Sequence, residues 1–181
     1  MDIKPFNTKL IIGLGNPGKE YSYSFHNAGF MLIDYLRENS KDKFEIANKK
    51  NYELTTFPGK NLKLLKPLTF MNNSGQVIAE FLKYNEYKPE EILIAFDDLD
   101  IEFGEYKLQH GKFPKSHNGI NSIQNATGET NYLYFRIGIE TRDEKRRLQQ
   151  SGEDYVLSKL SKQQKDVLES VFKKTDSLLE I

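Results

Sequence analysis

Cysteine is absent from this chain of 181 residues, and 26 basic and 26 acidic residues leave it with no net charge at pH 7. Without cysteine, a disulfide framework, a zinc–thiolate site and a thiol nucleophile are all excluded. Zero net charge means that long-range electrostatics does not draw the chain to a polyanion. Such a contact would have to use local cations, either Lys112 with Lys115 or Arg142 with Lys145-Arg-Arg147, and runs of this kind are more often solvated loops.

Long apolar runs are also missing, since no stretch approaches the roughly 18 residues that a membrane-spanning helix requires. No charged and then apolar leader segment opens the chain, so we expect a cytoplasmic protein that makes no membrane contact. Hydrophobic residues make up 38% of the chain, which at this length suits one hydrophobic core. Residues 1–181 are therefore expected to form one domain.

The distribution of apolar residues predicts an α/β protein. Alternating or apolar runs bounded by turn residues predict six strands, at Lys9–Leu14, Tyr52–Phe57, Leu62–Pro67, Ile92–Asp97, Glu105–Gln109 and Leu133–Glu140. Helical periodicity predicts four helices, at Asn27–Asn39, Ser74–Asn85, Asn118–Thr127 and Lys162–Glu180. The interleaved order indicates a single domain with a twisted mixed β-sheet flanked by helices.

Two local signals refine this outline. Ser161 and Gln164 have the spacing of a capping box at the start of the last predicted helix. The second and third predicted strands are joined by Pro58-Gly-Lys-Asn61, and we expect them to form an antiparallel hairpin within the sheet.

The first predicted strand runs into the glycine-rich turn Gly13-Leu-Gly-Asn-Pro-Gly18, whose spacing formally matches the dinucleotide-binding fingerprint. That fingerprint needs a helix at the third glycine and an acidic residue at the end of a second strand, about 20 positions further on. Here Pro17 precedes the third glycine, and the acidic candidate Asp34 lies within a predicted helix. Nucleotide binding is therefore the weaker interpretation of this turn.

Histidine is scarce, with three in the chain, and His26 follows the glycine-rich turn by only eight residues. Asp97 ends an apolar predicted strand, and a carboxylate on an imidazole would fix its tautomer and stabilise the imidazolium form. His26 and Asp97 are thus candidates for a base and its orienting partner, although each alone is more often a helix cap or a turn. The run Asp97-Asp-Leu-Asp100 is also compatible with a divalent-metal site, but an isolated acidic cluster is usually a turn.

No serine stands in a Gly-x-Ser-x-Gly nucleophile elbow, so a water molecule activated by histidine is the simplest hydrolytic chemistry available. Asn16, Asn72 and Asn118 lie at the ends of predicted strands or at the start of a predicted helix. Strand ends that share one sheet converge on one crevice, so we expect these residues to lie near His26 and Asp97. Carboxamides suit the binding of neutral peptide groups or of a developing oxyanion, although each of them alone is also typical of a turn or cap.

Six blocks together resemble the bacterial peptidyl-tRNA hydrolase family, in that family's order and spacing: Gly13-Leu-Gly-Asn-Pro-Gly18, His26-Asn-Ala-Gly29, Lys66-Pro-Leu-Thr-Phe-Met-Asn-Asn-Ser-Gly75, Asp97-Asp-Leu-Asp100, His117-Asn-Gly119 and Arg136-Ile-Gly138. The resemblance covers essentially the whole chain. It implies a monomeric, metal-independent enzyme without a cofactor that hydrolyses the ester between a peptide and the 3′ ribose of tRNA.

The resemblance also implies roles for individual residues. His26 would activate water and Asp97 would orient His26. The substrate contacts would be Asn16, Tyr21, Met71, Asn72 and Asn118. Lys107 and Arg136 resemble the family's clamp for the tRNA 5′ phosphate, and the loop 110–117 with the helix after it resembles a mobile lid.

Two features depart from the family's pattern. Ser24-Phe25 stands where the family usually has Thr-Arg, and the loop 110–117 is poor in glycine. Because the chain is neutral, we expect its tRNA binding to use a few local cations and to depend only weakly on salt. A catalytically silent RNA-binding relative is the alternative function, which the presence of both His26 and Asp97 disfavours.

Overall fold

A computed structural model of the chain describes residues 7–58 and 60–179, with side chains up to Thr175 in the last helix. The strands are β1 (Leu10–Gly13), β2 (Glu45–Asn48), β3 (Tyr52–Thr56), β4 (Lys63–Pro67), β5 (Ile92–Glu102), β6 (Tyr106–His110) and β7 (Leu133–Glu140). The α-helices are α1 (Ala28–Glu38), α2 (Ser74–Lys83), α3 (Asn118–Thr127), α4 (Glu144–Gln149), α5 (Gly152–Val156) and α6 (Lys162–Leu179). Short 3₁₀ turns are η1 (Phe25–Asn27), η2 (Met71–Asn73) and η3 (Pro89–Glu91). No helix in the described part of the chain is long and apolar enough to cross a membrane.

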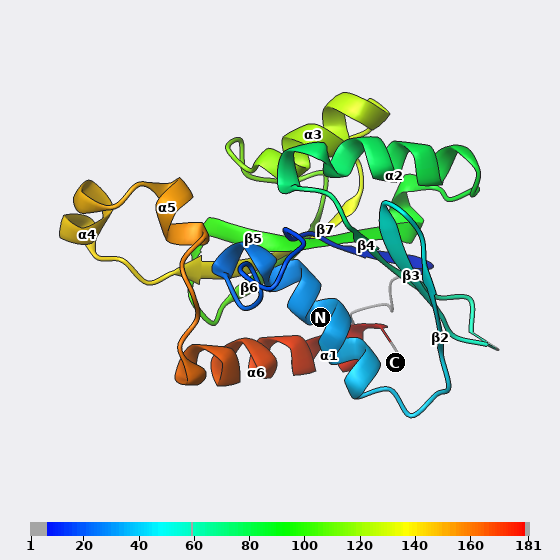
Figure 1. The fold of residues 1–181 in the computed structure, drawn as a ribbon, viewed down its shortest axis with the longest axis horizontal. Helices are drawn as coiled ribbons and strands as arrows, with labels where there is room; N and C mark the ends of the chain where they lie inside the picture. Colours follow the sequence, from blue (N-terminus) through cyan, green and yellow to red (C-terminus); the bar gives the residue numbers. More distant parts are fainter. Residues whose placement is uncertain (1–6, 59, 180–181) are drawn as a thin grey trace.

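The strands form one mixed sheet in the order β2-β3-β4-β1-β5-β7-β6 (Figure 1). The four central strands β4, β1, β5 and β7 are parallel to one another. β2 and β3 extend the sheet by antiparallel pairing on one side, and β6 pairs antiparallel with β7 on the other. The carboxyl ends of the central strands therefore lie along one edge of the sheet, where polar residues can meet.

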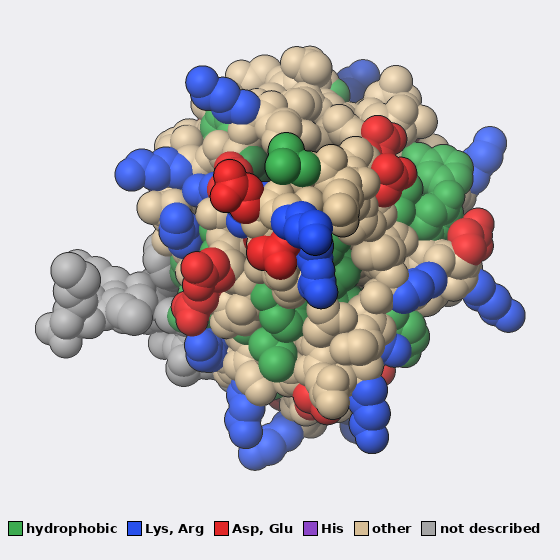
Figure 2. Space-filling view, turned by 90° about the vertical axis from the view of Figure 1, so that its left-hand side faces the viewer, with side chains coloured by type: hydrophobic (Ala, Val, Ile, Leu, Met, Phe, Trp, Pro, Cys, Tyr) green, Lys and Arg blue, Asp and Glu red, His purple; other side chains and the backbone are tan. Residues whose placement is uncertain are grey.

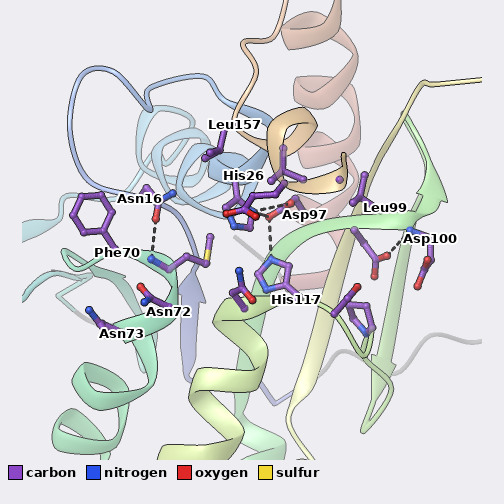
Figure 3. Close-up of a pocket in the computed structure, with 18 residues that line it drawn as sticks. Asn16, His26, Phe70, Asn72, Asn73, Asp97, Leu99, Asp100, His117 and Leu157 are labelled. Carbon is purple, nitrogen blue, oxygen red and sulfur yellow. Dashed lines mark hydrogen bonds and ion pairs between the residues drawn. The ribbon is translucent and has the colours of Figure 1, made fainter. Parts of the chain in front are cut away.

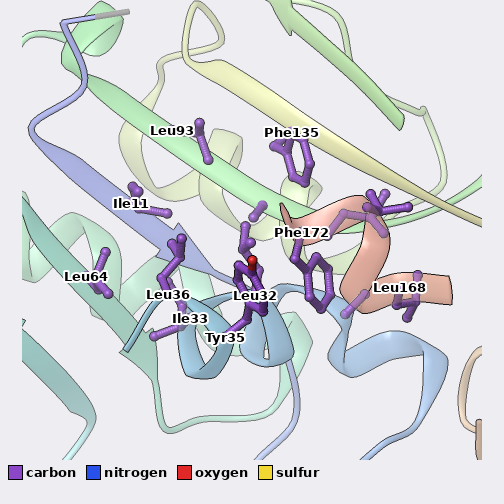
Figure 4. Packing of buried hydrophobic residues seen from close by; sticks show 14 of the residues in the cluster. Ile11, Leu32, Ile33, Tyr35, Leu36, Leu64, Leu93, Phe135, Leu168 and Phe172 are labelled. Carbon is purple, nitrogen blue, oxygen red and sulfur yellow. The ribbon is translucent and has the colours of Figure 1, made fainter. Parts of the chain in front are cut away.

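Helices cover both faces of the sheet, with α2 and α3 on one face and α1 and α6 on the other (Figure 1). Side chains alternate between the faces as strand geometry requires. Leu10 and Ile12 pack in the cluster with α2 and α3, whereas Ile11 packs with α1 and α6 (Figure 4). Because both faces of the central strands are buried, their sequences are nearly continuous apolar runs.

Close contact between β1 and α1 explains Gly13 and Gly29, since a Cβ on Gly13 would lie 2.3 Å from the carbonyl oxygen of Gly29. A Cβ on Gly29 would lie 2.3 Å from the carbonyl oxygen of Ala95 and 2.4 Å from the amide nitrogen of Leu14. The backbone N–H of Phe30 donates to the carbonyl of Leu14 at 3.1 Å, so the start of α1 is bonded directly to the end of the strand. The helix begins at Ala28 rather than at Gly18, and Asp34 lies within α1. Gly13 and Gly29 therefore serve helix–strand packing, and the dinucleotide fingerprint is not formed.

All ten predicted elements are present, and the antiparallel pairing of β3 with β4 confirms the hairpin. Ser161 and Gln164 form the predicted capping box, each bonding the other's backbone N–H. Gly59 of the hairpin turn and Glu180 of the last predicted helix lie outside the described residues.

The structure corrects the prediction at one strand and adds three elements. The predicted strand Ile92–Asp97 continues as β5 to Glu102, so the acidic run lies within the strand instead of closing it. β2, α4 and α5 were not predicted. β2 is fully exposed and shows no alternation, and it is defined by its pairing with β3. α4 and α5 have six and five residues, too few for a helical periodicity to be visible.

Replacing Gly29 with alanine should destabilise the fold by about 3 kcal/mol or more, because the added methyl group would overlap backbone atoms that cannot move aside. Gly152→Ala is the matched control, since its Cβ would meet only the mobile Cδ1 of Leu99, at 3.1 Å. Urea unfolding of both variants measures the difference. Equal stability of the two variants would contradict the packing described for Gly29.

Candidate active site

A cavity of about 740 Å³ opens at the carboxyl ends of β1, β4 and β5 (Figure 3). Its wall is formed by the turn after β1, by η2 after β4, by the second half of β5, by the start of α3 and by α5. Six of the residues selected from the sequence line it: Asn16, His26, Met71, Asn72, Asp97 and Asn118. The expected convergence of the element ends on one crevice is thus confirmed.

His26 is held against Asp97 at the inner end of this cavity. Its Nδ1 atom lies 2.9 Å and 3.0 Å from the two carboxylate oxygens of Asp97. His26 is 8% exposed and Asp97 is 2% exposed. Because an ionised carboxylate only accepts hydrogen bonds, Nδ1 carries the proton and the lone pair is left on Nε2. The free nitrogen of a ring that lines the cavity is the one available to a bound molecule.

His117 shares the same carboxylate. Its Nε2 atom lies 3.1 Å from Oδ1 of Asp97, while its Nδ1 accepts the backbone N–H of Ile120 at 3.3 Å and so caps α3. Since Nδ1 accepts, the proton of the neutral ring is on Nε2 and is donated to Asp97. The two imidazole rings lie with their centroids 5.1 Å apart. Asp97 therefore accepts from both histidines.

The charge of Asp97 determines the protonation of this group. Burial alone would lower the pKa of His26, but the charge of Asp97 and its hydrogen bond outweigh burial and raise that pKa above its ordinary value. Glu153 of α5 adds a smaller effect of the same sign. Burial would raise the pKa of Asp97, yet the two histidines hold it well below its usual range. Asp97 is thus ionised wherever the protein is folded near neutral pH.

Strand alternation separates the acidic residues of β5. Asp97 points to the face where η1 carries His26, whereas Asp98 lies on the opposite face and accepts a hydrogen bond from Nε of Arg136 at 2.7 Å. Asp100 is exposed, and its N–H donates to Asp98 Oδ1 at 2.8 Å. The three carboxylates do not converge on one point, so the acidic run does not form the metal site considered from the sequence.

In the described part of the chain, three side chains lie close enough together to act as ligands of one metal ion: His26, Asp97 and His117. One nitrogen or oxygen atom from each lies within 4.8 Å of the others. Both nitrogens that face Asp97 are at hydrogen-bond distance from it, and the Nδ1 contact of His117 to Ile120 requires a proton on its Nε2. We therefore interpret the three side chains as a proton-bonded group.

Asn27, the neighbour of His26, fixes the turn after β1. Its side-chain oxygen accepts the backbone N–H of Asn16 at 2.8 Å, and its side-chain nitrogen donates to the carbonyl of Asn16 at 3.0 Å. The Asn16 side chain in turn accepts the backbone N–H of Met71 at 2.8 Å (Figure 3). Because its Oδ1 is used in this way, the amide NH₂ group of Asn16 is the part left for a ligand.

The remaining predicted substrate contacts take different positions. Met71 is buried in the cavity wall, and the exposed side chains of Asn72 and Asn118 border its opening. Tyr21 does not line the cavity. Its ring packs edge-on against Phe70, with centroids 5.9 Å apart, and Phe70 is the residue that reaches the cavity.

The two predicted phosphate contacts lie opposite each other in the β6–β7 register. Lys107 is exposed, and its side chain makes no ion pair or hydrogen bond within the described part of the chain. Arg136 is only 11% exposed and is paired with Asp98. Much of the positive charge of Arg136 is therefore already compensated inside the protein.

The loop between β6 and α3 borders the cavity through Pro114 and Ser116. Phe113 of this loop packs against Tyr134, with ring centroids 5.5 Å apart. The loop is thus held to the sheet by an aromatic contact. His110, at its start, is exposed and does not line the cavity.

Sequence reasoning did not assign roles to His117, Asn27 or Glu153. The motif His117-Asn-Gly119 was a usable signal for His117, because it opens a helix next to Asn118. Glu153 lies on α5, which was not predicted. Phe25, which replaces the family's arginine, is 3% exposed and stacks on Tyr155 with centroids 4.7 Å apart. That position therefore belongs to the core in this chain.

The fold and the site together define an α/β protein with a buried group of two histidines and one aspartate at an open cavity bordered by carboxamides. Residues 10–181 match the family described as peptidyl-tRNA hydrolase. The peptidyl-tRNA hydrolase of Neisseria meningitidis serogroup A is 44% identical over 133 residues, covering 72% of this chain and 69% of that protein. The enzyme of Aquifex aeolicus is 38% identical over 168 residues, covering 92% of this chain and 85% of that protein.

The fold is also similar to that of a peptidyl-tRNA hydrolase of known structure. The crystal structure of peptidyl-tRNA hydrolase from Acinetobacter baumannii superposes with a TM-score of 0.81 at 32% identity, covering 98% of this chain and 91% of that one. The chain belongs to the peptidyl-tRNA hydrolase family, whose reaction is the release of the peptide from peptidyl-tRNA.

The pKa of His26 should be measurable by NMR titration of its ring and should lie above the ordinary value of about 6.5. In Asp97→Asn it should fall below that value, because burial then acts without the opposing charge. Asp100→Asn removes a carboxylate that is exposed at the cavity and is the control, which should leave the midpoint of His26 unchanged. An unchanged midpoint in Asp97→Asn would contradict the assignment of the charge effect to Asp97.

Proposed function

We propose that the chain cleaves the ester between a peptide and the 3′-terminal ribose of tRNA by attack of a water molecule that His26 activates. The observation that supports this proposal is the Nδ1 contact of His26 with the buried carboxylate of Asp97, which leaves Nε2 facing the cavity as a base. In the attack, the water oxygen bonds to the ester carbonyl carbon and its proton passes to Nε2. Asp97 stabilises the imidazolium ion that results.

Collapse of the tetrahedral intermediate completes the proposed reaction. The bond from carbon to the ribose oxygen breaks, and the leaving oxygen takes the proton back from His26, so that the enzyme is restored. The amide NH₂ of Asn16 and the side chain of Asn118 are proposed to donate hydrogen bonds to the substrate and to the developing oxyanion. With a base and oxyanion donors in place, an alkoxide leaving group of this kind requires no metal or cofactor. We propose a monomeric enzyme acting in the cytoplasm.

The carboxamides also support a proposal for substrate selection. Asn16, Asn72 and Asn118 present neutral amide groups, which suit the N-acyl group of peptidyl-tRNA better than the ammonium group of free aminoacyl-tRNA. Met71 and the exposed ring of Phe70 provide an apolar surface beside them. The enzyme would therefore spare ordinary aminoacyl-tRNA.

Replacing His26 with alanine should lower the rate of peptide release by about 10²–10⁴-fold, the usual effect of losing a general base. The assay uses an N-acylated aminoacyl-tRNA, with free aminoacyl-tRNA as a parallel substrate that the wild type should leave intact. His110→Ala is the matched histidine control and should keep the wild-type kcat. If the wild type binds tRNA but cleaves neither substrate, the chain is a silent RNA-binding relative.

Lys107 is proposed to contact the 5′ phosphate of the tRNA, since its exposed side chain lies beside Arg136 and makes no ion pair or hydrogen bond with any described residue. Lys107→Ala should raise KM about tenfold for tRNA with a 5′ phosphate. The same variant should behave like the wild type on tRNA without that phosphate. Lys50→Ala, at the opposite edge of the sheet, should change neither value. An equal rise for both forms of tRNA would mean that Lys107 contacts another group.

A further inference from the structure

The charged side chains in the wall of the cavity are acidic, apart from the two histidines. Among the described residues that line it, the carboxylates are Asp97, Asp98, Asp100 and Glu153, and neither lysine nor arginine is present. Lys115 lies between two lining residues but does not itself line the cavity. Figure 2 looks onto the end of the molecule where α4 and α5 lie, and most Lys and Arg side chains on this face are near its margin. The cavity is therefore anionic although the chain as a whole is neutral.

The four carboxylates differ in how far their charge is compensated. Asp97 accepts from two histidines, and Asp98 is paired with Nε of Arg136 at 2.7 Å. The side chains of Asp100 and Glu153 are exposed and make no ion pair or hydrogen bond within the described part of the chain. These two carboxylates are therefore the uncompensated charges of the cavity wall.

The backbone that carries Glu153 is firmly held. Directly before α5, the guanidinium of Arg142 donates to the carbonyls of Gln150 and Ser151, at 2.9 Å and 3.2 Å. The hydroxyl of Ser151 then caps α5 by accepting the backbone N–H of Asp154 at 3.0 Å. The carboxylate of Glu153 is thus presented to the cavity from a fixed helix.

The field of Glu153 extends to His26. Burial lowers the pKa of His26, whereas the charge of Asp97 and, more weakly, the charge of Glu153 raise it. The proposed attack takes place at Nε2 of His26, so a group bound there lies in the same field. A negative field weakens the binding of an anion and leaves the binding of a neutral group of the same shape almost unchanged.

The proposed reaction changes the charge of the molecule in the cavity. The ester carbonyl is uncharged, whereas the peptide product has a carboxylate that is ionised at neutral pH. The water oxygen stays on the acyl carbon, one water proton goes to the ribose oxygen, and the other goes to solvent when the acid ionises. The phosphates of the tRNA are the same before and after cleavage. The new peptide carboxylate is therefore the group on which the charges of the cavity act selectively.

We propose that Glu153, together with Asp100, repels the carboxylate of the peptide product and so limits product inhibition. The inference rests on the proposed function, because ester hydrolysis is what generates this acid in the cavity. Neither side chain needs to touch the product, since each acts by its charge across the cavity. The two carboxylates thereby favour the neutral substrate over the anionic product.

The test compares N-acetylphenylalanine with its amide, which has nearly the same shape but no charge. Binding of each is measured by NMR titration of the His26 ring, at a pH above the midpoint of His26 so that the ring is neutral. Glu153→Gln should strengthen binding of the acid about threefold and leave binding of the amide unchanged, and Asp100→Asn should act in the same direction. Glu86→Gln is the matched control in the loop before β5, far from the cavity in the sheet, and should match the wild type.

Charge reversal and salt test the electrostatic origin of the effect. Glu153→Lys should strengthen binding of the acid about tenfold, and a salt concentration of about 1 M should remove most of the difference between the variants. With N-acylated aminoacyl-tRNA as substrate, the inhibition constant of N-acetylphenylalanine should fall about threefold in Glu153→Gln.

Three results would overturn the inference: equal binding of the acid to the wild type and Glu153→Gln, an equal gain for acid and amide, or no effect of either ligand on the His26 ring. The binding measurements need no turnover, so they separate this inference from the proposed function. If the variants bind the acid as expected but the wild type leaves N-acylated aminoacyl-tRNA intact, the charge effect holds and the proposed function is wrong.

Discussion

One buried carboxylate, that of Asp97, organises the candidate active site. It accepts from both His26 and His117, and each partner comes from a different element packed on β5. A buried charge is strongly unfavourable unless it is paired and hydrogen-bonded, so Asp97 is stable only when both histidines are in place. Packing of η1 on one side and of the start of α3 on the other is thereby coupled to the ionisation of one group. The arrangement of these three side chains and the fold at this edge of the sheet therefore depend on each other.

The central elements could be predicted because they are long and apolar. β1, β4, β5 and β7 are buried on both faces, and their apolar runs are visible without tertiary information. Asn16 and Asp97 could be selected because they come where such runs end or turn polar. His26 could be selected because histidine is rare in this chain and this one precedes a helix.

The rest depends on contacts that no local pattern encodes. The partnership of Arg136 with Asp98 requires β5 to continue beyond its apolar run and to pair in register with β7. The role of His117 depends on which of its two nitrogens caps α3 and which one faces Asp97. The position of Glu153 follows from α5, whose five residues give no periodic signal. The position of Phe25 usually carries arginine in the family, and only the stack on Tyr155 shows that it belongs to the core in this chain.

Arg142 fixes both ends of the segment between β7 and α5, because its guanidinium pairs with Glu140 and donates to the carbonyls of Gln150 and Ser151. Because one guanidinium binds both ends of the segment, the cavity wall that begins at Gly152 is anchored independently of what lies between residue 142 and residue 150. Insertions, deletions or changes of charge within this segment would leave the catalytic geometry intact, as is typical of exposed loop tips. The guanidinium of Arg142 therefore separates the cavity wall, whose position it fixes, from an exposed segment whose length and charge can change without moving that wall.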